Sequence, residues 1–241
     1  MFPKIEDPEA WNVQVAQICT TYREAIELYC TQGIHTVSID EQTGIQALER
    51  IARDLLPKPG MLARREYEYI RHGTLGLFGN LHVATGEILS PLIRETRTEK
   101  DFAENIDGLV QGDADAHWRF VTDNLNTHVS ESLVVYVAAQ CGIETDLGVK
   151  GRRGILKSVS SRRDFLTDES HRIRFVYTPK HCSWLNQIEI WFGTLRKKLT
   201  RYGSFVSLED LQDRILRFID YYNETMAKPY RWTCDGSLLC K

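Results

Sequence analysis

The chain has 241 residues and a formal net charge of −3, with 42% hydrophobic, 26% charged and 10% aromatic residues. These values are typical of a globular protein with one large domain or two small ones, and they exclude fibrous and low-complexity chains. No window of about 18 uncharged apolar residues occurs, which argues against a membrane-spanning segment.

The first half of the chain is predicted to contain one helix followed by three strands. Helical spacing of apolar residues predicts a helix over about residues 9–30, ended by Gly33. β-Branched residues at 36–40 predict a short strand, and the Pro- and Gly-containing segment 57–60 predicts a turn. Two more strands over 74–83 and 87–93, joined by a turn at 84–86, predict an antiparallel hairpin.

The second half alternates helices and strands. Thr98 and Asp101 have capping-box spacing, which predicts a helix from that point to Val110. Residues 141–171 lack a clean period and are expected to be irregular. The other predicted elements are strands over 118–123 and 174–178 and helices over 130–139, over 183–199 and from Ser207 onward. This order indicates a mixed α/β domain.

Charge and cysteine content narrow the class further. Residues 150–201 hold 13 Lys and Arg against 4 Asp and Glu, whereas residues 1–149 hold 12 against 23. A local basic stretch attracts a polyanion, although charge alone is explained slightly better by a solvated loop and helix face. The six cysteines show no CxxC pair and no zinc-finger spacing, so they favour reduced thiols in a cytosolic protein.

Three acids are candidates for a metal site. Asp40 follows the predicted strand residues 37–39, and Asp123 follows 120–122. An acid at a strand end is held by a rigid sheet yet reaches solvent, so two on neighbouring strands can share a hard cation such as Mg²⁺. Glu189 lies between Ile188 and Ile190, an expensive position for an unpaired charge, and is the candidate third acid. From spacing alone, helix caps and turns remain the favoured interpretation.

Ordered motifs between about residues 35 and 235 change that balance. They are Ser38-Ile39-Asp40-Glu41, the segments 45–50, 71–78 and 83–86, Thr122-Asp123-Asn124 with Thr127-His128, the block 183–193 around Glu189, and the C-terminal segments 221–223, 228–229 and 231–233. Together they resemble the catalytic core of DDE-type transposases. More narrowly, the chain resembles the mariner-related superfamily of bacterial insertion-sequence transposases.

The resemblance implies a fold and a chemistry. That family is similar in fold to ribonuclease H, which implies an α/β domain with a mixed five-stranded sheet and helices on both faces. It further implies that Asp40, Asp123 and Glu189 are the three catalytic acids and bind two Mg²⁺ ions, for which Mn²⁺ can substitute. One ion would activate water for strand cleavage, and later the DNA 3′-hydroxyl for joining to a target. The other would stabilise the departing 3′-oxygen.

The implied partners are DNA, as transposon ends and target, and a second copy of the chain in a synaptic complex. The implied location is the bacterial cytoplasm, at the nucleoid during action. The interval from Asp123 to Glu189 is 66 positions, roughly double that of better-known members, which places a basic insertion at about 137–170. About 35 residues precede the first strand, whereas the family carries a helix-turn-helix region there.

The expected organisation is therefore a linker helix at 1–34, a catalytic domain at 35–235 and a tail at 236–241. This is the pattern of a truncated copy or of one of two reading frames. Candidate phosphate contacts are the basic residues Arg152, Arg153, Lys157, Arg162, Arg163, Arg196, Lys197 and Lys198.

Other residues near these motifs have weaker claims. Trp184 and Trp191, seven apart on one predicted helix, are expected in the core rather than stacked on DNA bases. Asn124 and His128 either orient a water or the metal shell or bond a helix start, and both interpretations stay open. Glu41 is expected on the opposite side of the strand from Asp40, and not as a ligand. The histidines 72, 82 and 181 are expected to be structural.

The leading hypothesis is a metal-dependent endonuclease and strand transferase of cut-and-paste transposition. The alternative is a catalytically silent remnant that binds DNA or oligomerises. A third possibility, a ribonuclease H-like enzyme that cuts RNA–DNA hybrids, is disfavoured by the block around Glu189.

Overall fold

The computed structural model describes residues 7–234, apart from 53, 54, 56, 65, 67 and 181. The expected tail, Cys240 and the imidazole at 181 therefore lie outside the described residues. Within the described part of the chain, no helix is both long and apolar enough to cross a membrane.

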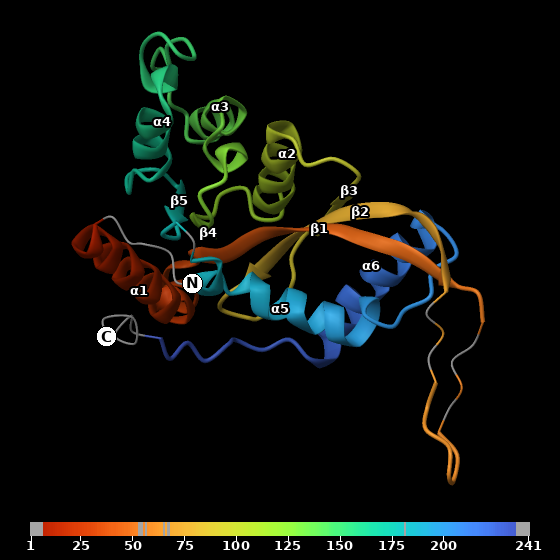
Figure 1. The fold of residues 1–241 in the computed structure, drawn as a ribbon. Coiled ribbons are helices and arrows are strands. Elements are labelled where there is room, and N and C mark those ends of the chain that lie inside the picture. The colour runs from red at the N-terminus through yellow and green to blue at the C-terminus, as the bar shows by residue number, and fades with distance from the viewer. Residues whose placement is uncertain are drawn as a thin grey trace.

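A five-stranded sheet lies between two layers of helices (Figure 1). The strand order is β3-β2-β1-β4-β5, with β1 parallel to β4 and antiparallel to β2. The remaining pairs are β2 with β3, antiparallel, and β4 with β5, parallel. The strands are β1 (His35–Arg50), β2 (Tyr69–His82), β3 (Leu92–Arg94), β4 (Trp118–Thr122) and β5 (Ile173–Tyr177). The predicted mixed five-stranded sheet with helices on both faces is confirmed.

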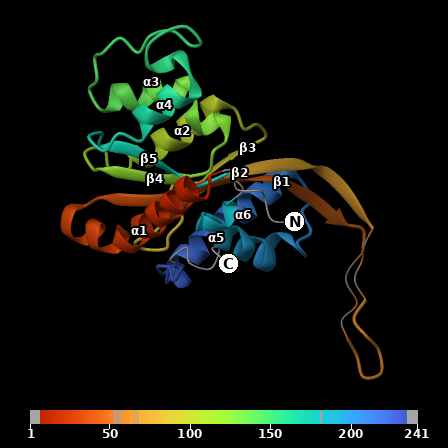
Figure 2. The same cartoon turned by 60° about the vertical axis from the view of Figure 1, so that its left-hand side comes forward.

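One face of the sheet is covered by α2 (Glu99–Val110), α3 (Glu131–Gln140) and α4 (Val159–Leu166), as Figure 2 shows. The expected capping box between Thr98 and Asp101 starts α2. Alternate residues of the central strands point to this face, because successive strand side chains face opposite ways. Its core includes Val37, Ile39, Phe102, Phe120, Leu133 and Phe175.

The other face is covered by α1 (Pro8–Gln32), α5 (Ile188–Leu195) and α6 (Leu208–Thr225). Here α1 packs Val15, Ile18 and Tyr22 against Val121 and Val176 of the sheet. Helix α1 therefore packs on the sheet as a layer of the domain, whereas the sequence predicts a linker helix over residues 1–34. The other two helices cover the β1–β2 half of the sheet with Trp191, Phe192, Leu211 and Ile215.

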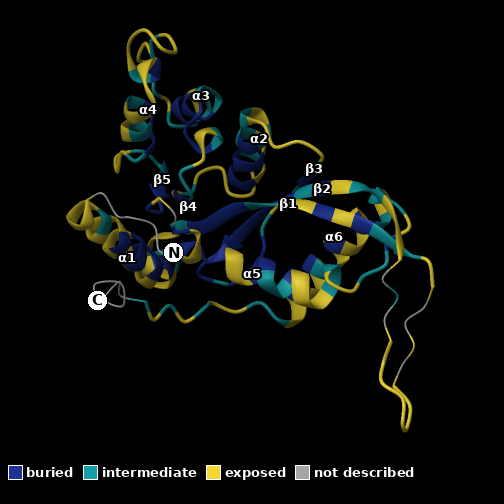
Figure 3. Ribbon diagram, viewed as in Figure 1, coloured by how far each residue is buried: buried dark blue, intermediate teal, exposed yellow. Residues whose placement is uncertain are grey.

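Strands β1 and β2 extend beyond the predicted segments. They continue as a long antiparallel hairpin that projects from the body of the molecule (Figure 1) and is exposed over much of its length (Figure 3). The predicted turn at 57–60 lies near the tip, where Lys58 and Met61 exchange two backbone hydrogen bonds of 2.8 and 3.1 Å. The sequence did not predict this extension of β1, because residues 41–44 are polar or glycine and the pairing register shifts after Gln42.

Two helical segments also differ from expectation. The stretch 141–171 is not irregular throughout, because Ser158 and Ser161 form a capping box that starts α4, and Leu156 and Leu166 join the core. The pattern was missed because an eight-residue helix shows little apolar periodicity. The helix predicted over 183–199 is instead a 3₁₀ turn (Ser183–Leu185), then α5, then a π-helical turn (Arg196–Thr200).

Candidate active site

Asp40 and Asp123 lie at the same end of two neighbouring parallel strands. Ser38 of β1 pairs with Val121 of β4, and each acid lies two residues beyond its member of this pair. Asp40 is 8% exposed, whereas Asp123, just after β4 ends, is half-buried. The sheet therefore brings together the two acids that were predicted from strand ends.

Asp40 is held by neutral hydrogen-bond donors. Its Oδ2 accepts from Asn186 Nδ2 at 3.2 Å, and its Oδ1 accepts from the backbone N–H of Glu41 at 2.8 Å. Asn186 Nδ2 also donates to the carbonyl of Ile39 at 2.8 Å. Burial, together with the negative charge of Asp123, raises the pKa of Asp40 to about 7. The protonated carboxyl is therefore well populated near neutral pH in the metal-free protein.

A buried polar network fixes the start of α5 over β1. Ser38 Oγ accepts from the N–H of Ile188 at 3.0 Å and donates to Asn186 Oδ1. Tyr22 Oη of α1 accepts from the N–H of Gln187 at 3.3 Å. These contacts satisfy helix-terminal N–H groups that would otherwise be orphaned. They also place Glu189, the second residue of α5, beside the strand that carries Asp40.

Gly79 permits this close approach. It pairs with Asp40 in the β1–β2 register. A Cβ atom at Gly79 would lie 2.7 Å from the ring of Phe192 and 3.1 Å from Ile188 Cδ1, both on α5. Any side chain here would push the helix away from the sheet, so the missing Cβ is what allows α5 to lie over Asp40.

Glu189 is exposed on α5 and belongs to the same electrostatic group. Partial burial, together with the charge of Asp123, raises the pKa of Glu189 above its usual value. The charge of Asp123 therefore opposes ionisation of both Asp40 and Glu189, from one strand and one helix. The three acids that were predicted as a set interact electrostatically at one end of the sheet.

Asp123 differs from Asp40 because a cation holds it. His128, fully buried in a short 3₁₀ helix (Asn126–Val129), brings Nδ1 to 2.7 Å from Asp123 Oδ1 and Nε2 to 2.9 Å from Glu41 Oε1. Burial lowers the pKa of His128, but the hydrogen bonds and charges of the two carboxylates outweigh it and raise that pKa to about 9. Burial likewise raises the pKa of Asp123, but His128 and the N–H of Leu125 bring it below its usual value.

Sequence reasoning missed the role of Glu41 and left that of His128 open. The prediction that Glu41 faces away from Asp40 agrees with its contact to His128 on the α2 side of the sheet. Asn124 Nδ2 donates to the carbonyl of Thr178, a contact that joins the segments just after β4 and β5. Asn186 and Ser38 had no signal of their own beyond the motifs that contain them.

The donor set suits a hard divalent cation. All three acids offer carboxylate oxygens, which Mg²⁺ and Mn²⁺ prefer, and two of them have raised pKa values that a nearby cation would reverse. Among the described residues, no three His, Cys, Asp or Glu side chains are gathered tightly enough to hold a metal as they stand. The acids fit the ion in the chemistry of their oxygens and in their mutual electrostatics, and binding it would require their side chains to move closer together.

The basic candidates divide into exposed and structural groups. Arg162 is buried, with Nε donating to the carbonyl of Val129 at 2.7 Å and Nη1 to that of Leu156 at 3.1 Å, so it cannot contact a phosphate. Arg163 is half-buried with its guanidinium 5.0 Å from the Tyr177 ring centroid. The exposed candidates are Arg152, Arg153 (paired with Asp146 at 2.5 Å), Lys157, Arg196, Lys197 and Lys198.

The tryptophan and histidine expectations have mixed outcomes. Trp191 is fully buried as expected, but Trp184 is 46% exposed, because it lies on the separate 3₁₀ turn and not on α5. His72 bonds Glu49 at 2.8 Å on the β1–β2 hairpin, and His82 lies 3.3 Å from the imidazole of His35. Both contacts are structural in character.

The chain is similar in sequence to one protein family and in fold to several solved transposase structures. The family model for DDE superfamily endonucleases matches residues 35–212. A solved Mos1 mariner paired-end complex with Mn is 12% identical, with a TM-score of 0.52 over 91% of this chain and 57% of that chain. A Mos1 transposase paired-end complex with the left transposon end is 13% identical, with a TM-score of 0.51 and the same coverage.

At these identities the likeness shows a shared fold. The chain spans about 57% of the length of these solved transposase chains. No curated protein matches it.

Proposed function

Because the chain belongs to the DDE superfamily of endonucleases, we propose that it is the catalytic domain of a cut-and-paste transposase. It would cleave DNA strands and transfer them to a target with two divalent metal ions. The observation that carries this proposal is that Asp40 and Asp123 lie at the same end of neighbouring parallel strands, with the start of α5, which carries Glu189, packed over β1. The charge of Asp123 raises the pKa of both other acids. Carboxylates that oppose one another's ionisation in one place are typical of cation sites.

Asp40, Asp123 and Glu189 would hold the ions, Mg²⁺ or Mn²⁺. When bound, the ions supply an activated water or 3′-hydroxyl and stabilise the departing 3′-oxygen. Asp123 is the most readily ionised of the three, because His128 and the N–H of Leu125 outweigh its burial and bring its pKa below the usual value. Asp40 gives up a proton from its carboxyl on ionisation, while Asn186 and the N–H of Glu41 keep that carboxyl in place.

The exposed basic residues would bind the DNA backbone. Arg196 lies seven residues after Glu189, two helical turns along the same side, and Lys197 and Lys198 follow it. A strand held by these side chains would pass the three acids. The candidates Arg152, Arg153 and Lys157 lie in the basic insertion before α4. The proposed partners remain transposon ends, target DNA and a second copy of the chain, in a bacterial cytoplasm at the nucleoid.

Cleavage of supercoiled plasmid tests the proposal. The wild-type chain should nick the plasmid with Mg²⁺ or Mn²⁺ and not with EDTA. Asp40→Asn, Asp123→Asn and Glu189→Gln should each lower the rate on the order of 10³-fold, since each removes a ligand for ions that supply several kcal/mol. Asp220→Asn, an exposed acid on α6, is the matched control and should cleave normally.

Two outcomes would redirect the assignment. Cleavage that survives the three site substitutions would remove them from the active site. Salt-sensitive DNA binding without metal-dependent cleavage would favour the silent remnant.

A further inference from the structure

His128 is clamped by four elements of the fold. Its two ring nitrogens contact Glu41 of β1 and Asp123 after β4, at 2.9 and 2.7 Å. Its ring lies 4.1 Å from that of Phe102 on α2, and its carbonyl accepts from Tyr177 Oη of β5 at 2.8 Å. The imidazole is fully buried, so it has one orientation.

This arrangement assigns the two oxygens of Asp123 different tasks. Oδ1 accepts from the N–H of Leu125 at 3.0 Å and lies 2.7 Å from His128 Nδ1, which also lies 2.9 Å from Thr122 Oγ1. No described residue donates a hydrogen bond to Oδ2. A carboxylate held through one oxygen presents the other in a fixed direction, which is the arrangement a metal ligand needs.

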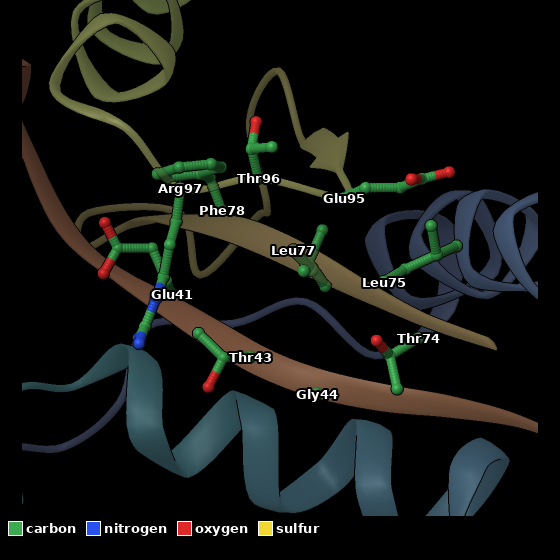
Figure 4. A pocket seen from close by; sticks show the side chains of 11 residues that line it. Glu41, Thr43, Gly44, Thr74, Leu75, Leu77, Phe78, Glu95, Thr96 and Arg97 are labelled. Carbon is green, nitrogen blue, oxygen red and sulfur yellow. The ribbon is translucent and has the colours of Figure 1, made fainter.

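Glu41 completes the arrangement from the far side. Its side chain is 5% exposed and lies on the opposite face of β1 from Asp40, so it is not itself placed as a ligand. Glu41 Oε1 faces Nε2, while Asp123 Oδ1 and Thr122 Oγ1 face Nδ1, so polar contacts hold both edges of the ring. Glu41 also lines a cavity of roughly 220 Å³ between β1, β2 and the loop before α2 (Figure 4).

We propose that Glu41 and His128 are a positioning pair, which fixes Asp123 so that its Oδ2 faces the divalent cation. This inference rests on the proposed function, and it extends the site by two residues that touch neither metal nor DNA. Groups that orient a metal ligand are worth about 10–100-fold in metal affinity.

The test is calorimetric titration of Mn²⁺ into the full chain without DNA. Glu41→Gln and His128→Gln should each weaken Mn²⁺ binding about 10–100-fold. The double variant should be little worse than either one, because Glu41 acts only through His128. Glu49→Gln is the matched control, since Glu49 bonds His72 at 2.8 Å on the hairpin, and its Mn²⁺ affinity should be unchanged.

The direction in which Mn²⁺ affinity changes in the two variants separates a positioning role from a simple effect of charge. Through-space charge alone would weaken Mn²⁺ binding in Glu41→Gln, which removes a negative charge, but not in His128→Gln, which removes none. Positioning predicts weaker binding in both. Cleavage at saturating Mn²⁺ should return to within a few-fold of wild type, a recovery that loss of folding would not give.

Three results would overturn the pair. They are wild-type affinity in Glu41→Gln, equal or tighter binding in His128→Gln, and additive effects in the double variant. Failure of the wild-type chain to bind Mn²⁺ would instead contradict the proposed function itself. Should Glu41→Gln not fold, the comparison of His128→Gln with wild type still decides the sign.

Discussion

The two sides of strand β1 hold neighbouring acids by different chemistry. On the α5 side, Asp40 accepts only neutral donors, and its pKa is raised to about 7. On the α2 side, Glu41 shares the buried imidazole of His128 with Asp123, whose pKa is lowered. One sheet therefore presents a carboxyl that exchanges its proton near neutral pH beside another that stays ionised.

The difference shows that burial alone does not determine the charge of an acid. Desolvation raises the pKa of both Asp40 and Asp123, and only the second is reversed by a cationic partner. A bound divalent ion would act on Asp40 as His128 acts on Asp123.

The largest expected effect on stability comes from removing the imidazole of His128, the charged partner on the α2 side. His128→Gln should lower the free energy of unfolding by about 3 kcal/mol, because the buried Glu41 carboxylate loses its charged partner. Urea denaturation at pH 7 measures this loss. His72→Gln breaks a half-exposed pair of the same type and should cost about 1 kcal/mol or less. Equal losses in the two variants would show that burial of the pair is unimportant.

The second effect is a pH dependence of the unfolding free energy that comes from Asp40, on the α5 side of β1. The folded pKa of Asp40 is raised, so its contribution to stability is present at low pH and is lost as pH rises through about 7. Between pH 8 and pH 5 the metal-free wild type should gain about 2–3 kcal/mol of unfolding free energy that Asp40→Asn lacks. Parallel pH profiles of the two proteins would contradict the raised pKa.

The third effect concerns the amide that holds Asp40. Asn186→Ala removes the donor to both Asp40 and the Ile39 carbonyl, leaving buried acceptors unpaired at a cost of about 2 kcal/mol. Denaturation measures the cost, and plasmid cleavage should slow as Asp40 loses its orientation. Unchanged cleavage in a folded variant would exclude a positioning role for this amide.

The smallest effect on stability is expected at Tyr22, in the buried hydrogen-bond network at the start of α5. Tyr22→Phe removes a hydroxyl that accepts from Gln187 N–H at 3.3 Å and donates a long bond of 3.5 Å to Ser38 Oγ, which should cost about 1 kcal/mol. Thermal denaturation measures the change. A loss above 3 kcal/mol would mean that this hydroxyl, and not Ser38, holds the start of α5.

The parts of the fold with local patterns were predictable from the sequence. The predicted strand ends pointed to Asp40 and Asp123, and the apolar neighbours of Glu189 made it the third candidate. The family resemblance then favoured the three acids as a set. The partners of these acids were not predictable, because they lie far apart in the chain. Glu41 and His128 are 87 positions apart, and Asn186 is 146 from Asp40. Only the folded sheet brings them into contact.

Other errors have local causes. Trp184 was expected in the core because one continuous helix was assumed, but the 3₁₀ turn ends before α5 begins. Arg162 was counted among DNA contacts because charge predicts exposure, whereas its guanidinium satisfies two buried carbonyls. The composition of a segment does not distinguish an arginine that is buried in this way from one that is exposed.

The central claim is that three carboxylates share divalent ions at one end of the sheet. Anomalous diffraction from crystals soaked in Mn²⁺ tests it most directly. The account predicts manganese peaks within bonding distance of oxygens from Asp40, Asp123 and Glu189. Peaks elsewhere, with these three carboxylates free of metal, would contradict it.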